Sequence, residues 1–147
     1  MKTHTYTIIA LIVLTGSMAV AAQAQTSRGT ELRASIPFQF NVGDKTMPAG
    51  EYTISQVNPS SDPAVMQLHA KDGSRAVMIQ VNNVIGNGRE SSRLLFNRYG
   101  SQYFFAQAWT MGDITGWQAP KSKAERLASK ELADMKPAPA TIALRLR

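Results

Sequence analysis

The chain contains no cysteine among its 147 residues. Without thiols it forms no disulfide bonds, has no thiolate ligands for a structural zinc ion, and carries no lipid on an N-terminal cysteine. The sequence therefore predicts a protein whose stability comes from packing alone.

Residues that signal catalysis or cofactor binding are also scarce. Of two histidines, only His69 lies beyond residue 24, and we interpret it as a plain surface residue. There is no G-x-S-x-G segment or D-x-D-x-D-G loop, and nothing in the spacing of Glu51, Glu90 and Asp113 selects a carboxylate pair for glycoside hydrolysis. Gly86-Asn87-Gly88 lacks the Lys and Ser/Thr of a phosphate-binding loop. We expect no catalytic residues, metal site or cofactor.

A long apolar run occurs once, over residues 8–14 near the N-terminus. Small residues follow, and Ala-Gln-Ala at 22–24 fits the A-x-A pattern, which predicts signal-peptide cleavage between Ala24 and Gln25. The alternative is a transmembrane anchor, but polar and small residues at 15–17 interrupt the run before it reaches the ~20 residues that span a bilayer. The sequence therefore predicts export to the periplasm or the cell exterior, with no membrane span after cleavage.

The chain is basic, with 16 Lys and Arg against 10 Asp and Glu and a net charge of +6. These basic residues are scattered along the chain, whereas a nucleic-acid interface gathers them on one face. The distribution argues against nucleic acid as a partner and favours anionic surfaces such as lipopolysaccharide or acidic glycans.

Alternating apolar and polar residues predict strands in the first half of the exported chain. The alternation runs through residues 32–42, where Pro37 indicates a sheet edge or an irregular point, and it returns over residues 51–57. Asn58-Pro59-Ser60-Ser61-Asp62-Pro63 has the composition of a loop.

Two hairpins are predicted. The first spans residues 64–81 around Asp72-Gly73, a pair typical of a type I′ turn, and its register places Leu68 opposite Val77. It likewise sets Met66 opposite Ile79 and Ala64 opposite Val81. The second spans residues 93–109 around Gly100-Ser101, and sets Phe96 opposite Phe105 and Arg98 opposite Tyr103.

The last third of the chain changes character. Residues 111–120 are predicted to be an irregular loop around Ile114 and Trp117. Ser122-Lys123-Ala124-Glu125 fits a capping box, followed by a helix of about 14 residues. Its predicted apolar stripe comprises Ala124, Leu127, Ala128, Leu132 and Met135.

These elements predict a mainly β fold, an antiparallel β-sandwich or small open barrel of about five to seven strands with one C-terminal α-helix. The predicted organisation is a signal peptide at 1–24, a β domain with its helix at 25–135, and a Pro/Ala-rich spacer at 136–147. The alternating residues at 141–147 either add a final strand or remain a flexible tail.

Several segments, in this order, resemble a family of small secreted proteins common in soil acidobacteria. They are F-N-V-G-D-K at 40–45, P-A-G-E-Y-T-I at 48–54, L-F-N-R-Y-G at 95–100 and Y-F at 103–104. The resemblance covers most of residues 34–133. That family has no assigned function, so the resemblance implies an architecture and an exported location but no catalytic residue.

The candidate binding residues are aromatic side chains and a neighbouring arginine, because aromatic faces on exported β domains stack on sugar rings. They are Tyr99, Tyr103, Trp109, Trp117 and Arg98. We prefer the interpretation that these aromatics build the core, and we expect Trp117 to be the one most exposed.

Three functions are compatible with these observations. The preferred one is a non-catalytic exported β module that binds a glycan or a cell-surface protein. The second is a hydrolase of extracellular polymers, which requires two carboxylates about 5–10 Å apart in a cleft. The third is a structural protein associated with the outer membrane, against which the charged, capped helix argues.

Overall fold

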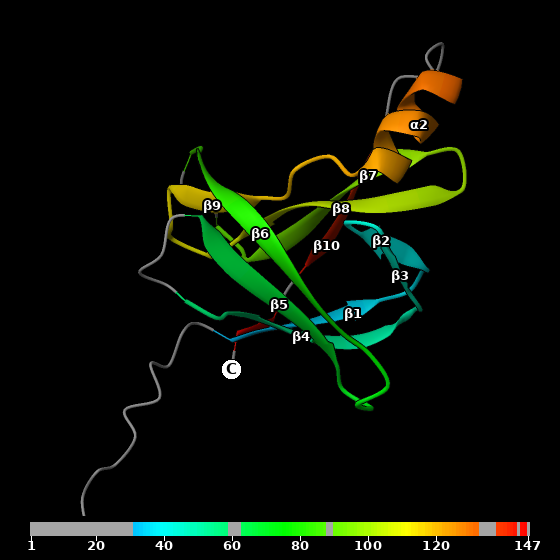
Figure 1. The fold of residues 1–147 in the computed structure, drawn as a ribbon. Helices are drawn as coiled ribbons and strands as arrows, with labels where there is room; N and C mark the ends of the chain where they lie inside the picture. Colours follow the sequence, from blue (N-terminus) through cyan, green and yellow to red (C-terminus); the bar gives the residue numbers. More distant parts are fainter. Residues whose placement is uncertain (1–30, 59–62, 88–89, 133–137, 144, 147) are drawn as a thin grey trace, which may run out of the picture.

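The computed structural model describes residues 31–58, 63–87, 90–132, 138–143 and 145–146 (Figure 1). The predicted cleavage site at Ala24 and Gln25, the middle of the loop at 59–62, and Met135 lie outside the described residues. Within them, the mainly β class with one helix near the C-terminus is confirmed.

The first six strands are β1 (Leu32–Ile36), β2 (Phe40–Val42), β3 (Lys45–Met47), β4 (Gly50–Gln56), β5 (Ala64–Ala70) and β6 (Ala76–Ile85). The remaining elements are β7 (Arg93–Tyr99), β8 (Gln102–Trp109), β9 (Thr115–Gln118), α2 (Lys123–Glu131), β10 (Ala138–Ala143) and β11 (Arg145–Leu146). The strands outnumber the predicted five to seven because the chain breaks at Pro37 between β1 and β2, and because β9, β10 and β11 are short additions.

The strands form two sheets that share β6. The hydrogen-bonded path runs β10-β7-β8-β9-β6-β5-β4-β1-β11, and β2 and β3 attach to it through β8. The first part of β6 pairs with β5, whereas Asn82–Ile85 pair with β9, so one strand passes from one sheet into the other. Figure 1 shows β7, β8 and β9 across the upper part of the molecule and β1 and β4 across the lower part, with β5 and β6 in front. The path does not close, because no ladder joins its two ends.

The core lies between the sheets and follows the predicted alternation. Every second residue of β1 and β5 is buried, and both hairpins have the predicted registers. Phe40 packs edge-on against Tyr52 and against Phe96, with ring centroids 5.2 and 5.4 Å apart. Aromatic rings from β2, β4 and β7 therefore join the sheets at the centre of the molecule.

The turn between β5 and β6 is not the predicted type I′. That turn needs a positive φ at both central residues, but only Gly73 has one (+73°), and Asp72 does not. The amide of Ala70 donates to the carbonyl of Arg75 at 2.8 Å, which closes a longer loop over 71–74. The Asp72 carboxylate accepts from the Ser74 amide at 2.9 Å and holds this loop in place.

The helix begins as predicted but buries only part of its predicted apolar stripe. The Ser122 hydroxyl accepts from the amide of Glu125 at 3.1 Å, which confirms the N-cap. The predicted stripe is confirmed only in part: Ala128 is buried and Leu132 packs against it, whereas Ala124 and Leu127 are exposed. Glu125, which was not part of the stripe, is buried as well. The reason is a polar anchor, because the Glu125 carboxylate accepts from Asn97 Nδ2 at 2.8 Å and rotates this face of α2 toward the sheet.

One further segment, residues 115–118, differs from the prediction, and the C-terminal segment settles the choice between a strand and a flexible tail. Residues 115–118 form β9 where a loop was predicted, because Trp117 pairs with both Asn83 and Ala108. Residues 138–143 pair with β7 and Arg145 pairs with Arg33 of β1, so the C-terminal segment adds strands to both sheets.

Candidate functional site

The predicted aromatic residues do not share one binding face. Tyr99 is 4% exposed beneath α2, where it packs against Phe104 with ring centroids 5.8 Å apart. Its hydroxyl donates to Glu125 Oε1 at 3.4 Å. Tyr99 therefore holds the helix on the sheet and is not accessible to a ligand.

Trp109 is also part of the interior, at 3% exposure. A Cβ atom added at Gly86 or at Gly116 would lie 2.6 Å from its indole ring, so the ring packs directly on both backbones. The indole Nε1 donates to Gln107 Oε1 at 3.0 Å. This packing excludes Trp109 from a sugar-stacking surface.

Tyr103 is half-buried and has neighbours on both faces of its ring. Phe38 stacks on it with centroids 3.9 Å apart and planes 15° from parallel, and the Arg98 guanidinium carbon lies over the ring at 5.5 Å. Because Phe38 occupies one face, Arg98 covers the other. The Arg98 Nε donates to the carbonyl of Gly100 at 2.8 Å, which holds the guanidinium there. Trp117 is half-buried and packs against the core, away from this stack.

A different set of residues, missed by the sequence analysis, surrounds an ion pair between Glu51 of β4 and Lys71 after β5. The two are joined twice: Lys71 Nζ lies 2.5 Å from Glu51 Oε2, and the Lys71 amide donates to the Glu51 carbonyl at 2.9 Å. Two pockets meet at this pair, and we call the whole region the Glu51–Lys71 site.

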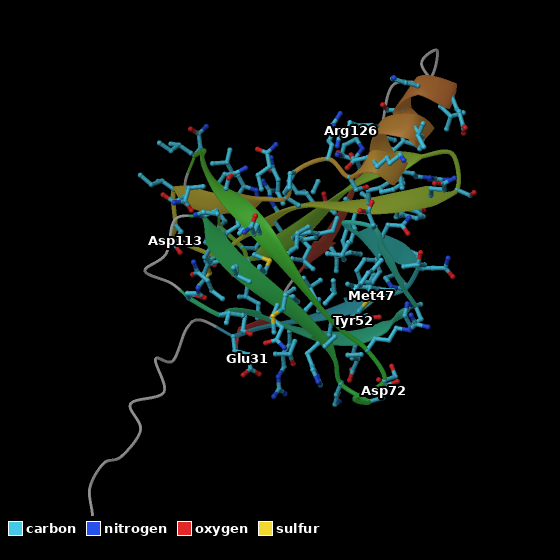
Figure 2. All side chains as sticks on the ribbon, viewed as in Figure 1. Glu31, Met47, Tyr52, Asp72, Asp113 and Arg126 are labelled. Carbon is cyan, nitrogen blue, oxygen red and sulfur yellow. The ribbon has the colours of Figure 1, made fainter. Side chains whose placement is uncertain are left out.

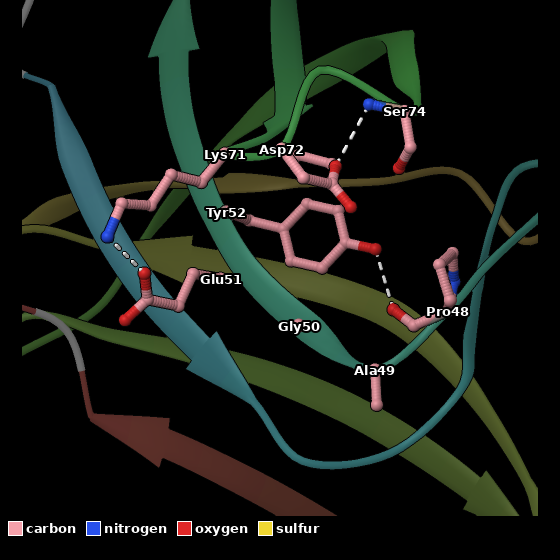
Figure 3. A pocket seen from close by; sticks show the side chains of 9 residues that line it. Pro48, Ala49, Gly50, Glu51, Tyr52, Lys71, Asp72 and Ser74 are labelled. Carbon is pink, nitrogen blue, oxygen red and sulfur yellow. Dashed lines mark hydrogen bonds and ion pairs between the residues drawn. The ribbon is translucent and has the colours of Figure 1, made fainter.

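The first pocket, the hairpin pocket, has a volume of about 430 Å³ (Figure 3). Its lining residues are Pro48, Ala49, Gly50, Glu51, Tyr52, Ala70, Lys71, Asp72 and Ser74. The Tyr52 hydroxyl donates to the Pro48 carbonyl at 2.6 Å, and burial raises the pKa of that phenol. Tyr52 therefore stays protonated and fixes the wall of the pocket without serving as a base.

The second pocket, the strand pocket, has a volume of about 630 Å³. Its lining residues are Arg33, Ala34, Ser35, Glu51, Tyr52, Thr53, Lys71 and Ala143. Four of the polar lining residues lie on the outward face of the paired strands β1 and β4, where Arg33 is opposite Thr53 and Ser35 is opposite Glu51. The strand pocket therefore presents a guanidinium, an ammonium, a carboxylate and two aliphatic hydroxyls.

Both carboxylates of the hairpin pocket are ionised at neutral pH. The hydrogen bond and positive charge of Lys71 lower the pKa of Glu51, and hydrogen bonds from Ser74 lower the pKa of Asp72. Glu51 and Asp113, two of the acids considered from sequence, are not brought together: Figure 2 places Asp113 at the opposite end of the molecule from Tyr52 and Asp72. Glu90 is an exposed loop residue.

The described residues offer no metal-ligand cluster and no membrane-spanning helix. No three of their His, Asp and Glu side chains gather as a metal-ligand set, and His69 is exposed on β5. The helix they form is too short and too polar to cross a bilayer.

The fold and site define a two-sheet β protein with a charged, pocketed surface at one end. No protein-family model, curated protein or solved structure matches the chain.

Proposed function

We propose that this chain is a non-catalytic binding module that acts outside the cytoplasm and takes a glycan at the Glu51–Lys71 site. The observation that carries the proposal is that two pockets meet at one ionised pair on a paired-strand surface. Tyr99 and Trp109 are buried, Trp117 packs against the core, and Phe38 and Arg98 cover Tyr103, so the proposed site replaces these residues.

The chemistry of the pockets supports a sugar ligand. Hydroxyl groups of a sugar donate to carboxylates and accept from ammonium and guanidinium groups, and Glu51, Lys71 and Arg33 supply all three. Small apolar side chains, Ala49 and Ala70 among them, provide contact for C–H groups. A sugar that carries a carboxylate also fits the net positive charge of the chain.

The first prediction tests this site. A thermal-shift screen of residues 25–147 against neutral and acidic oligosaccharides should give a reproducible shift, since ligand at ~100 times its Kd adds about 2.7 kcal/mol of stability. Lys71→Ala should abolish the shift, because it removes an ammonium common to both pockets. Lys130→Ala, which removes an exposed lysine on α2, is the matched control and should leave the shift intact. Equal shifts in both variants would contradict the proposed site.

Glycoside hydrolysis is the second candidate, because Glu51 and Asp72 line the same pocket. Retaining and inverting mechanisms both need one carboxylic acid with a raised pKa as the proton donor, whereas the pKa of each of these groups is lowered. We therefore favour binding. Release of reducing ends from a bound polysaccharide, lost in Asp72→Asn, would reverse that preference.

A further inference from the structure

The two hairpins β2–β3 and β5–β6 face each other across a cleft. Among the described residues, β3 pairs only with β2, and Ala76–Val81 of β6 pair only with β5. The cleft between them has a volume of about 460 Å³ and is lined by Lys45, Thr46, Met47, Ser74, Arg75 and Ala76. Two strand edges therefore border one hollow.

The free edge of β6 starts at Ala76, which lines this cleft. The amide of Ala70 donates to the carbonyl of Arg75, so these two form a hydrogen-bonded pair of the antiparallel ladder. Such pairs alternate along a ladder, so the odd-numbered residues of β6 bond to β5. The N–H and C=O groups of Ala76, Met78 and Gln80 consequently point away from β5.

One backbone group of β3, the carbonyl of Thr46, also points toward the cleft. Arg75 Nη1 lies 3.5 Å from the carbonyl oxygen of Thr46, which shows that this carbonyl points toward β6. An arginine side chain thus spans the distance between the edges. Ile79 lies 3.8 Å from the Cβ position of Gly43, so the hairpins approach at the other end.

The charge of the cleft selects the class of partner. Lys45 and Arg75 are exposed cations, and none of the six lining residues is acidic. Met47, which is buried, supplies an apolar wall on the core side. A strand placed here alternates its side chains between an apolar interior and these two cations.

We propose that the cleft between β3 and β6 binds an extended acidic peptide of a partner protein as an added strand. Its backbone bonds to the free edge of β6, and its carboxylates lie against Lys45 and Arg75. This interaction is separate from glycan binding and does not depend on it.

The test uses nine-residue synthetic peptides with alternating valine and polar positions, in which the polar residue is glutamate, glutamine or lysine. Binding to residues 25–147 is measured by fluorescence anisotropy, with Met78→Pro as the test variant and Met78→Ala as its matched control. Proline at 78 removes an N–H of the free β6 edge and leaves the ladder to β5 intact, which thermal melting checks.

We expect the glutamate series to bind and the lysine series not to bind. Met78→Pro should weaken the glutamate series by about tenfold or more, and Met78→Ala should not. The double variant Lys45→Gln with Arg75→Gln should weaken binding and reduce its dependence on salt. Failure of the glutamate series to bind, or equal affinity in the two Met78 variants, would overturn the proposal. Dimerisation of the protein alone that Met78→Pro abolishes would assign the edge to a second copy and overturn it too.

Discussion

At the residue scale, Gly116 illustrates how a missing side chain positions a large one. Its absent Cβ leaves room for the indole of Trp109, which lies 2.6 Å from the position that atom would take. The φ of Gly116 is not positive, so space and not backbone conformation requires glycine at this position.

Gly116→Ala should therefore destabilise the protein by about 1–3 kcal/mol, because the indole must shift in a packed site. Urea unfolding followed by tryptophan fluorescence measures the change. Gly50→Ala is the matched control, since its added Cβ would meet Tyr52 at an ordinary 3.8 Å. Similar losses in the two variants would mean that the contact with Trp109 does not determine the effect.

A second residue-scale prediction concerns pH. Because Lys71 lowers the folded-state pKa of Glu51 below 4.5, the ion pair stabilises the protein above that pH. This contribution is lost as the pH falls through the folded-state pKa. The difference in Tm between the wild type and Glu51→Gln should accordingly be present at pH 7 and shrink as the pH falls through the folded-state pKa of Glu51. Both groups are exposed, so the difference at pH 7 will be small. In a Lys71→Gln background, where the ion pair is absent, the same Glu51→Gln change should show no such difference.

At the scale of elements, α2 depends on its first turn for attachment as well as for helix formation. Ser122 caps the helix by accepting from the Glu125 amide, and the carboxylate of the same Glu125 accepts from Asn97 and from Tyr99. The cap therefore holds Glu125 where it anchors α2 to β7.

Ser122→Ala should cost about 1 kcal/mol of the free energy of unfolding, because the Glu125 amide loses its acceptor. Ser129→Ala, farther along the same helix, is the control and should change stability by a few tenths of a kcal/mol at most. Hydrogen exchange of the α2 amides should rise in Ser122→Ala alone. Equal exchange in both variants would show that the cap does not hold the helix.

At the scale of the whole molecule, the C-terminal segment links the two sheets. Its first part pairs with β7 in one sheet, and Arg145 pairs with Arg33 in the other. Ala140 and Ile142 pack against the core from this segment. β6 is the first connection between the two sheets, and this segment is the second.

A chain that ends at residue 137 should thus lose cooperative unfolding or aggregate, since the edges of β7 and β1 would be exposed. Urea melting and size-exclusion chromatography test this expectation. A truncated protein that remains monomeric with unchanged stability would contradict it. The resemblance to secreted acidobacterial proteins remains a prediction, and so does the export signal. N-terminal sequencing of the exported protein would test whether cleavage occurs after Ala24.

Local patterns were sufficient for much of this fold. The alternation in β1 and β5, both hairpin registers and the Ser122 cap depend on neighbours in sequence, so the residues themselves specify them. Two-residue periodicity correctly predicted the mainly β class, and the capping box at Ser122 predicted the one helix.

Tertiary structure alone decided which aromatic residues are accessible and where charged side chains meet. Tyr103 is covered by Phe38, and Trp109 is packed against Gly86 and Gly116, contacts between segments distant in sequence. The Glu51–Lys71 pair likewise depends on the pairing of β4 with β5, which no local pattern specifies. Periodicity determines which face of a strand is buried, but only the complete packing determines what covers it.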